Sequence, residues 1–402
     1  MEHIHHSGDL GKKEEDPGSL ASQIAPLLFL TGIFLLISMS RNILSPLMPA
    51  IKQELGLGHD EAGSLFLLVT LGHSFMVLGS GFISSRLNHR KTIILSSLAI
   101  GGALFAVALS PGIWEIRIGL VFAGLAAGLY IPSGIATLTG LVRPGDWGKA
   151  VAVHELAPNL SFLAAPLLTE ALLGFLSWRG ILVLLGVTSV FCGLIFIRFG
   201  KGGRFPGEAP RVSTLKIFMV EPSFWFMMGL FALGIGGSSG VYSMLPLYLI
   251  ADRDMERGFA NTLMGLSRIP TLFTSFVAGW VTDRFGPKRT LIGIFMLAGL
   301  ATILMGTVRT SWIVPIVFLQ PILAASFFPA GFAALSRIGS PQIKNLAVSL
   351  TIPFSFIIGA GAIPAGIGIF GEAGLFSLGI SLLGVILLGG VILSSFLKLK
   401  RV

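Results

Sequence analysis

The sequence predicts an all-α polytopic membrane protein with about twelve transmembrane helices in two pseudo-symmetric six-helix bundles. Two observations predict this fold class. The chain of 402 residues is strongly apolar along most of its length. Its second half also repeats motifs of its first half at a nearly constant spacing.

The composition excludes a soluble globular protein. Hydrophobic residues make up 53% of the chain and charged residues only 12%, whereas a soluble domain carries about 25% charged residues. The mean hydropathy is +0.86, so we expect a lipid bilayer to surround the chain. Cys192 is the only cysteine, which excludes an intrachain disulfide. The sequence predicts no metal site, no cofactor and no catalytic residues.

Apolar stretches of roughly 20 residues or more follow one another along the chain, bounded by charged or Gly/Pro-rich clusters. The first six lie near residues 24–50, 61–84, 92–110, 113–139, 150–174 and 180–198. The second six lie near residues 222–250, 260–283, 290–308, 312–336, 345–370 and 373–396. We therefore expect an N-terminal bundle over residues 24–199 and a C-terminal bundle over residues 217–397.

Three short polar segments lie outside the predicted bundles. Residues 1–23 are expected to form a disordered cytoplasmic tail, residues 200–216 a cytoplasmic linker and residues 398–402 a second cytoplasmic tail. This orientation follows the positive-inside rule, because most lysines and arginines outside the spans then face the cytoplasm of a bacterial inner-membrane protein. The exceptions are Lys52, Arg117, Arg179, Arg253, Arg257 and Arg309. Topology thus explains the net charge of +9, and no nucleic-acid partner is expected.

Two sequence motifs recur in the second half. Residues 81–92, GFISSRLNHRKT, return as GWVTDRFGPKRT over residues 279–290, an offset of 279 − 81 = 198. Residues 132–138, PSGIATL, return as PAGFAAL over residues 329–335, an offset of 329 − 132 = 197. Parallel repeats of this kind predict two like halves related by an axis normal to the membrane.

The repeated loop resembles the signature G-x-x-x-D-R-x-G-x-[RK]-[RK] of the major facilitator superfamily, which follows helices 2 and 8 in that family. The chain is therefore identified as a member of this family of secondary transporters over its whole hydrophobic length. The second copy matches the signature. In the first copy, Ser85 stands in place of the acid and Asn88 in place of the glycine.

The resemblance implies a role for the charges of this loop. In the family they contact neighbouring helix ends at the cytoplasmic gate, and an acid beside Arg or Lys forms an ion pair that breaks during rocking. The alternative is that these charges only set the topology. The candidate gate residues are Arg86, Arg90, Lys91, Asp283, Arg284, Lys288 and Arg289.

Ionisable residues inside the spans are the main functional candidates, because a charge at the centre of a span costs roughly 2.5 to 3.5 kcal/mol. The predicted helices 3, 6, 9 and 12, which are peripheral in the family's fold, carry no charge in their interiors. Helices that line or flank the family's central cavity carry Arg41, His73, His154, Glu155 and Arg268. This distribution indicates a water-filled cavity between the halves.

Arg41 and Arg268 are predicted to bind one anion between them, one from each half. The segment 41–49, RNILSPLMP, resembles the first helix of organic-anion members such as the glycerol-3-phosphate antiporter and the hexuronate and galactonate symporters. In those proteins an arginine here grips a phosphate or carboxylate. Monocarboxylate and nitrate transporters are similar in using an arginine on helix 8. Asn42 and His73 complete the predicted substrate-binding set; structural pairing of the arginines and a polar core role for His73 are the alternatives.

His154 and Glu155 are predicted to couple transport to protons. The repeat-related positions in the second half are Thr351 and Ile352, so acid and imidazole are required in one half only. Desolvation favours a neutral carboxyl group and a nearby arginine favours the carboxylate, which is the balance that a proton-coupled carrier exploits. A static salt bridge between Glu155 and an arginine is the alternative.

The sequence thus predicts a secondary active transporter of a small, carboxylate-like organic anion. It would work as a monomer by proton-coupled uptake and alternating access. One alternative is efflux of an amphipathic compound by proton antiport, which aromatic residues such as Trp225, Phe226, Phe327 and Phe328 favour. The other is a membrane sensor that is built on the same fold and transports nothing.

Overall fold

The computed structural model describes residues 18–209, 222–338, 350–397 and 399. Eleven helical segments in this part of the chain are long and apolar enough to cross a membrane. The only β feature within it is an isolated bridge between Gly18 and Val142. The predicted all-α polytopic fold class is confirmed.

The helices follow the order of the predicted spans. Those of the first half are η1 (Leu20–Gln23), α1 (Ile24–Asn42), α2 (Leu44–Leu55), α3 (His59–Leu87), α4 (His89–Ala108), α5 (Ile113–Gly128), α6 (Tyr130–Leu141), η2 (Pro144–Asp146), α7 (Trp147–His154), α8 (Leu156–Leu173) and α9 (Trp178–Phe199). Those of the second half are α11 (Pro222–Ile235), η3 (Gly236–Gly240), α12 (Val241–Ala251), α13 (Arg257–Leu266), α14 (Thr271–Phe285), α15 (Pro287–Thr307), η4 (Thr310–Trp312), α16 (Ile313–Ala325), α17 (Phe327–Leu335), η5 (Ile357–Ala362), α19 (Ile363–Glu372) and α20 (Phe376–Phe396).

Proline residues interrupt several spans, and each break lies the same number of residues before its proline. A proline lacks an N–H group, and its ring collides with the carbonyl four residues earlier, so a helix cannot run regularly through that point. Each of four breaks lies three residues before a proline. The pairs of break and proline are Ile43 and Pro46, Leu129 and Pro132, Glu155 and Pro158, and Ser326 and Pro329. Each of these spans is therefore a pair of shorter helices joined by a bend.

The predicted span near residues 260–283 is interrupted more strongly. Helix α13 ends at Leu266 and α14 begins at Thr271, with a turn over residues 267–270 that ends on a proline. Neither helix alone is long enough to count among the eleven continuous spans. Together the two helices occupy the place of the remaining predicted span.

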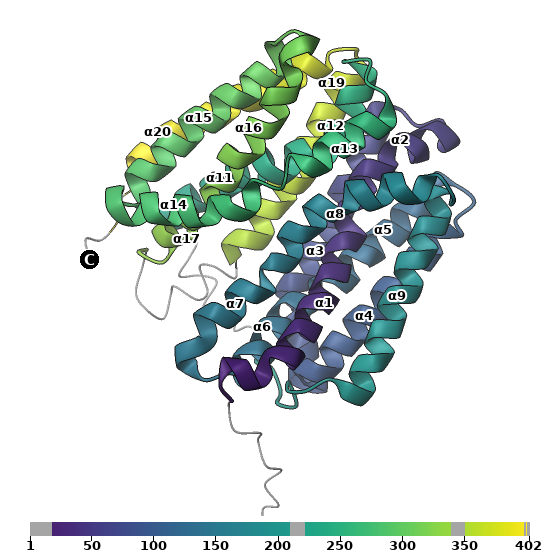
Figure 1. The fold of residues 1–402 in the computed structure, drawn as a ribbon, viewed down its shortest axis with the longest axis vertical. Helices are drawn as coiled ribbons and strands as arrows, with labels where there is room; N and C mark the ends of the chain where they lie inside the picture. The colour runs from purple at the N-terminus through teal and green to yellow at the C-terminus, as the bar shows by residue number, and fades with distance from the viewer. Residues whose placement is uncertain (1–17, 210–221, 339–349, 398, 400–402) are drawn as a thin grey trace, which may run out of the picture.

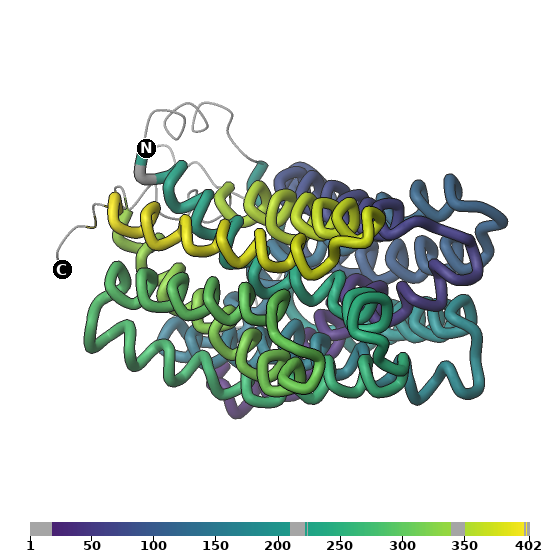
Figure 2. Tube along the Cα trace, turned by 90° about the horizontal axis from the view of Figure 1, so that it is seen from above, coloured from purple at the N-terminus to yellow at the C-terminus, as the bar shows by residue number. Residues whose placement is uncertain are grey.

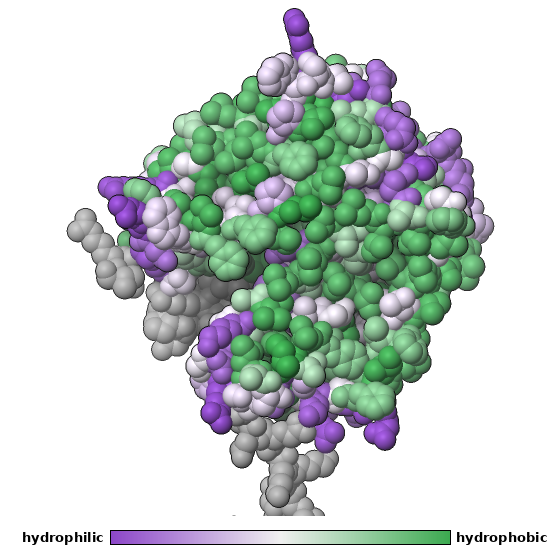
Figure 3. All heavy atoms as spheres, viewed as in Figure 1, coloured by the Kyte–Doolittle hydropathy of each residue, from purple (hydrophilic) through white to green (hydrophobic). Residues whose placement is uncertain are grey.

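The two halves of the chain form two bundles that pack side by side. Figures 1 and 2 show the purple to teal helices of the first half beside the green and yellow helices of the second half. The halves touch at the end that carries α2, α12, α13 and α19, which we call the closed end (Figure 1). Figure 3 shows an indentation between the halves at the opposite, indented end. Apolar side chains form a broad belt between the polar ends, as expected of a membrane-spanning bundle (Figure 3).

Part of the predicted disordered tail is ordered. The N–H of Gly18 donates to the carbonyl of Leu141 at 3.1 Å, and residues 20–23 form η1. The side chain of Asp146 accepts a hydrogen bond from the backbone N–H of Leu20 at 3.2 Å. These contacts fix the start of the first span against the loop before α7. The rest of the predicted tail, residues 1–17, lies outside the described residues.

The beginning of the predicted linker also packs against the first half. The N–H of Gly207 donates to the carbonyl of Ser84 at 3.0 Å, next to the repeated loop. Residues 200–209 therefore extend along the indented end of the bundle. The rest of the linker, together with residues 217–221 at the start of the predicted C-terminal bundle, lies outside the described residues.

Candidate functional site

A small cavity lies where the two halves meet. Its volume is about 40 Å³, which is room for only one or two water molecules. Its polar lining residues are Arg41, Asn42, Thr70, His73, Ser239 and Ser243. Its aromatic lining residues are Phe66, Phe162, Tyr242 and Phe356. In this conformation the cavity must enlarge before an organic molecule can enter.

Arg41 gives the lining of this cavity its positive charge. It lies in the last turn of α1, just before the break that Pro46 imposes, so the bend directs the chain around it. Its Nη1 atom lies 2.8 Å from Nε2 of His73, and its guanidinium lies 5.5 Å from the ring centroid of Phe356 in the second half. None of the ion pairs among the described residues includes Arg41. Its charge is therefore not balanced by any of the described carboxylates.

Hydrogen bonds hold the cavity walls together. The amide Nδ2 of Asn42 donates to the Ser161 hydroxyl of α8 at 2.7 Å. Across the halves, the Ser45 hydroxyl donates to the carbonyl of Tyr242 at 2.7 Å. Asn42 thus fixes α1 against α8 within the first half, and Ser45 links α2 to α12 beside the cavity.

Arg268 does not line this cavity. It lies in the turn before Pro270 and is 3% exposed. Its guanidinium lies 4.8 Å from the ring centroid of Tyr242 and 5.2 Å from that of Phe162, and both rings line the cavity. Its Nε atom has no hydrogen-bond partner among the described residues. The structure therefore brings Arg41, Asn42 and His73 together, whereas Arg268 contacts the aromatic wall.

His154 is completely buried and has a defined hydrogen-bonding pattern. Its ring stacks on Phe34 with 4.4 Å between the ring centroids. The Tyr130 hydroxyl donates to the carbonyl of Leu30 at 2.8 Å and lies 3.0 Å from Nε2 of His154. A hydroxyl has one hydrogen. Because the Tyr130 hydroxyl donates that hydrogen to the carbonyl of Leu30, its oxygen accepts a hydrogen bond from Nε2–H of His154. In the neutral ring, Nδ1 is then the basic nitrogen.

Glu155 faces that basic nitrogen. Its Oε1 atom lies 3.7 Å from Nδ1 of His154, and its side chain is 52% exposed. The residue occupies the break before Pro158 and so lies between α7 and α8. None of the ion pairs among the described residues joins Glu155 to an arginine. At 3.7 Å the two atoms are near but not hydrogen-bonded, and Nδ1 has no hydrogen-bond partner among the described residues.

The repeated loops adopt the same backbone shape. Asn88 has φ 77° and ψ 164°, and Gly286 has φ 82° and ψ 151° at the equivalent position. This region of backbone angles is essentially restricted to glycine. The Asn88 side chain offsets part of the strain, because its Oδ1 accepts from the N–H of Lys91 at 3.0 Å. The first copy thus keeps the loop shape without the glycine.

Two cations of the repeated loops hold equivalent helix ends. Arg90 donates to the carbonyls of Phe196 and Ile197, both at 3.1 Å, at the end of α9. Lys288, at the offset 288 − 90 = 198, donates to the carbonyls of Ser395 and Leu397 at 2.6 and 3.0 Å at the end of α20. Cations there satisfy free carbonyls and oppose the negative end of the helix dipole. The other predicted gate residues are exposed, namely Arg86, Lys91, Asp283, Arg284 and Arg289.

Polar contacts join the halves at the closed end. Glu170 of α8 accepts from Arg257 at 3.3 Å and from Asn261 at 3.1 Å, both of α13. Glu372 of α19 accepts from the backbone N–H of His59 at 2.6 Å. These residues were not among the predicted functional residues, and their only signal in the sequence is a position at the end of a span. They form a closure made of one carboxylate from each half.

A family model described as Major Facilitator Superfamily matches residues 30–269. The chain is 26% identical to the multidrug efflux protein YfmO of Bacillus subtilis (strain 168) over 282 residues, which is 67% of this chain and 66% of that protein. It is 22% identical to the 4-hydroxybenzoate transporter PcaK of Pseudomonas putida over 296 residues, which is 64% of this chain and 66% of that protein.

The fold is also found among solved structures. A bacterial homologue of the human lysosomal transporter Spinster, in an inward-facing and occupied conformation, superimposes with a TM-score of 0.82. The match covers 94% of this chain and 97% of that chain at 16% identity. At this identity the likeness concerns the fold alone.

Proposed function

The chain belongs to the Major Facilitator Superfamily and is a multi-pass membrane transporter rather than an enzyme, and from this premise we propose that it carries a small organic anion. The observation that carries the proposal is the isolated charge of Arg41 in the cavity between the halves. A charge held away from water costs several kcal/mol unless a partner compensates it. A substrate carboxylate supplies that partner, and the guanidinium offers it two parallel hydrogen bonds.

The aromatic walls indicate what the rest of the substrate is like. Phe66, Phe162, Tyr242 and Phe356 line the cavity with apolar rings from both halves. Rings of this kind favour an apolar or aromatic body next to the carboxylate. One relative is named for the transport of 4-hydroxybenzoate, which is an aromatic carboxylate. We therefore propose an aromatic monocarboxylate as the substrate class.

Arg268 is proposed as a second cation for the same anion. It lies against Phe162 and Tyr242, which separate it from the described cavity. Its Nε–H is buried and has no acceptor among the described residues. A rotation of the two rings during rocking of the halves would expose this donor to the substrate. In the enlarged, occupied cavity, Arg41 and Arg268 would then both bind the anion.

His154 and Glu155 are proposed as the proton-coupling pair. Glu155 is half-exposed and is in contact with Nδ1 of a completely buried imidazole. The hydrogen bond to Tyr130 holds the other ring nitrogen in its protonated form. Protonation at Nδ1 turns the contact with Glu155 into an ion pair, which changes the charge at the bend between α7 and α8. Helix α8, on one side of that bend, packs against α13 and α14 of the second half.

We propose a cytoplasmic location for both termini in a bacterial inner membrane, on the basis of the positive-inside rule. The closed end, with Glu170, Arg257 and Glu372, is then the outer end. The indented end faces the cytoplasm, so the conformation is inward-facing with a cavity that is shut around Arg41. The charges of the repeated loops, Arg86, Arg90, Lys91, Asp283, Arg284, Lys288 and Arg289, are proposed to form the gate on the cytoplasmic side in the outward-facing state.

A second candidate function is efflux of an amphipathic compound by proton antiport. The aromatic walls of the cavity suit such a compound, and one relative is named as a multidrug efflux protein. The uncompensated Arg41 disfavours cationic drugs in particular, because like charges repel in a cavity that is held away from bulk water. Anionic amphipathic compounds remain compatible with this second function.

The test is transport by proteoliposomes under an imposed proton gradient. The panel contains benzoate derivatives, short aliphatic carboxylates and an apolar cation. We expect proton-driven accumulation of a carboxylate by the wild type, its loss in Arg41→Lys, and exchange without accumulation in Glu155→Gln. Arg309→Lys is the matched control, because Arg309 is exposed in a loop. Transport of the apolar cation without any carboxylate would overturn the proposal.

A further inference from the structure

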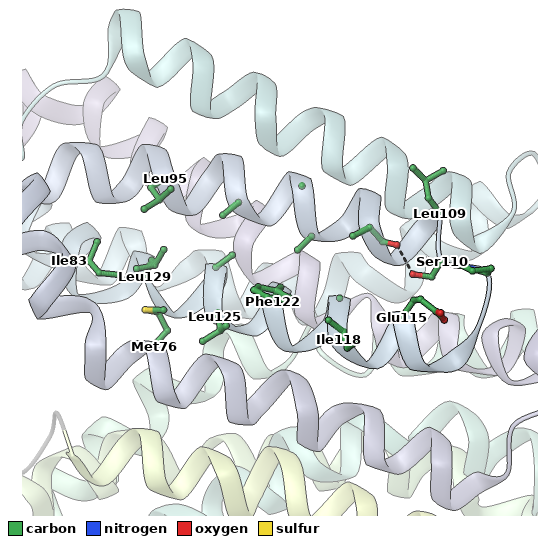
Figure 4. Close-up of a pocket in the computed structure, with 17 residues that line it drawn as sticks. Met76, Ile83, Leu95, Leu109, Ser110, Glu115, Ile118, Phe122, Leu125 and Leu129 are labelled. Carbon is green, nitrogen blue, oxygen red and sulfur yellow. Dashed lines mark hydrogen bonds between the residues drawn. The ribbon is translucent and has the colours of Figure 1, made fainter.

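A long apolar groove runs along the outside of the first half, between α3, α4 and α5 (Figure 4). Its volume is about 800 Å³. Figure 4 shows apolar side chains along its length, with Glu115 and Ser110 at one end. Exposed residues such as Leu95, Leu109 and Phe122 border it, so the groove opens toward the surrounding membrane.

Small residues of α4 create this groove. Ala99, Gly102 and Ala106 lie along it, and a Cβ atom added at Gly102 would meet nothing within 4 Å. The repeat places Leu297, Leu300 and Leu304 of α15 at the corresponding positions, at the offset of 198. All three leucines are exposed. In the second half, leucine side chains therefore occupy the space that stays empty in the first half.

We propose that this groove binds one membrane phospholipid that has an amine in its headgroup, with one acyl chain lying along α4. From Leu95 to Leu109 the helix rises about 21 Å. One leaflet contributes about 15 Å of hydrocarbon, so an acyl chain from a single leaflet fits along the groove. A void this large and this apolar is filled in a membrane, and acyl chains are the apolar groups that surround it.

The charge at the end of the groove selects the headgroup. Glu115 is exposed at the start of α5, and none of the ion pairs among the described residues includes it. The neighbouring Arg117 is already paired with Glu61 at 3.1 Å. Trp114, which is exposed beside them, is typical of the membrane–water interface. The free carboxylate at this level meets an ammonium group, so phosphatidylethanolamine binds in preference to phosphatidylglycerol.

The test uses the full chain in nanodiscs that contain phosphatidylethanolamine with a photoreactive diazirine on its acyl chain. Cross-linked peptides are mapped by mass spectrometry. We expect cross-links in the wild type to concentrate on residues of the groove in α4 and α5. Gly102→Leu, which copies the leucine of the second half, is expected to reduce them to the level of other lipid-facing helices.

Gly293→Leu is the matched control. Gly293 is exposed on α15, lies outside the groove, and an added Cβ there also meets nothing within 4 Å. This variant is expected to keep the wild-type cross-links. Even labelling of all lipid-facing helices, or labelling that Gly102→Leu leaves unchanged, would overturn the proposal.

The headgroup part has its own readout. Photoreactive phosphatidylglycerol is compared with phosphatidylethanolamine at equal acyl-chain composition, in the wild type and in Glu115→Gln. We expect the wild type to favour phosphatidylethanolamine and Glu115→Gln to lose that preference while groove labelling remains. Equal labelling by the two lipids in the wild type would refute the selection by Glu115.

Discussion

Nη1 of Arg41 lies 2.8 Å from Nε2 of His73, and this contact defines the protonation of the imidazole. Arginine stays protonated in proteins and only donates hydrogen bonds. Nε2 of His73 must therefore accept, which leaves the ring neutral with its hydrogen on Nδ1. His73 orients the guanidinium without reducing its charge, so the attraction for an anion is kept.

Changes at His73 are expected to act through Arg41. His73→Leu removes the ring nitrogen that accepts a hydrogen bond from Arg41. The guanidinium then has a donor without a partner and is no longer held in its orientation. A hydrogen bond to a charged group contributes about 1.5–3 kcal/mol, so we expect kcat/KM for the substrate to fall about 10- to 100-fold. His73→Gln supplies an amide oxygen and is expected to retain most of the activity. Equal loss in both variants would show that the contact with Arg41 does not matter.

The closed end is expected to open more readily when its ion pair is removed. Glu170→Gln loses the charge that pairs with Arg257. Because both side chains are partly exposed, we expect an effect of about 0.2–1 kcal/mol, which changes the ratio of closed to open molecules up to about fivefold. Spin labels at Gln53 and Thr310, in a background with Cys192→Ala, would report a larger fraction of long distances.

The control for this experiment is Glu61→Gln. Glu61 also pairs with an arginine, Arg117, at 3.1 Å, but both residues belong to the first half. Its removal is expected to leave the distance distribution between the labels unchanged. A distribution that responds equally to both substitutions would contradict a specific role of Glu170 in closure.

The architecture and the position of the breaks follow directly from sequence chemistry. Apolar stretches of bilayer length define the spans, because every backbone polar group must be satisfied within the membrane. Prolines then explain why Arg41, Glu155 and Arg268 lie where helices are interrupted, since each precedes a proline by two to five residues. This spacing is visible in the sequence and would have strengthened the prediction of these three residues.

The arrangement around the cavity depends on contacts that sequence reasoning does not provide. Phe162 and Tyr242 come from different halves, and their rings meet only after the halves dock. They keep Arg268 from the cavity that Arg41 lines, which a charge pattern does not reveal. The contact between Glu170 and Arg257 likewise joins the two halves, and the charge pattern of the sequence does not indicate which carboxylate meets which arginine.

The hydrogen bond between Tyr130 and His154 is expected to support proton-driven transport. Tyr130→Phe keeps an aromatic ring but removes the oxygen that accepts from Nε2–H. Nε2–H of the completely buried imidazole is then left without this acceptor. One hydrogen bond contributes about 0.5–1.5 kcal/mol, so we expect the rate of proton-driven uptake to fall about 2- to 10-fold.

The control for this loss is a second buried tyrosine. Tyr248→Phe removes a hydroxyl that donates to the carbonyl of Met305, far from the proposed proton site in the sequence. Its rate of proton-driven uptake per folded molecule is expected to match that of the wild type even if its stability falls. A loss of the same size in both variants would indicate a general effect of destabilisation on transport.

Gly286 is expected to tolerate asparagine better than alanine. At φ 82° and ψ 151° any side chain is strained, by about 1–3 kcal/mol, although an added Cβ meets no atom within 4 Å. Gly286→Ala should therefore lower the midpoint of thermal unfolding in detergent. Gly286→Asn should lower it less, because the asparagine at position 88 caps the next helix from the same backbone shape.

Gly293→Ala separates backbone strain from the mere addition of a methyl group. Gly293 is helical, and an added Cβ there is equally unobstructed. Alanine is favoured over glycine within a helix by about 0.5–1 kcal/mol, so its midpoint should rise or stay unchanged. The expected order is Gly293→Ala at the top, then Gly286→Asn, then Gly286→Ala. Equal midpoints for the two Gly286 variants would mean that the side-chain cap contributes nothing, and the loop would owe its shape in the first half to the surrounding packing.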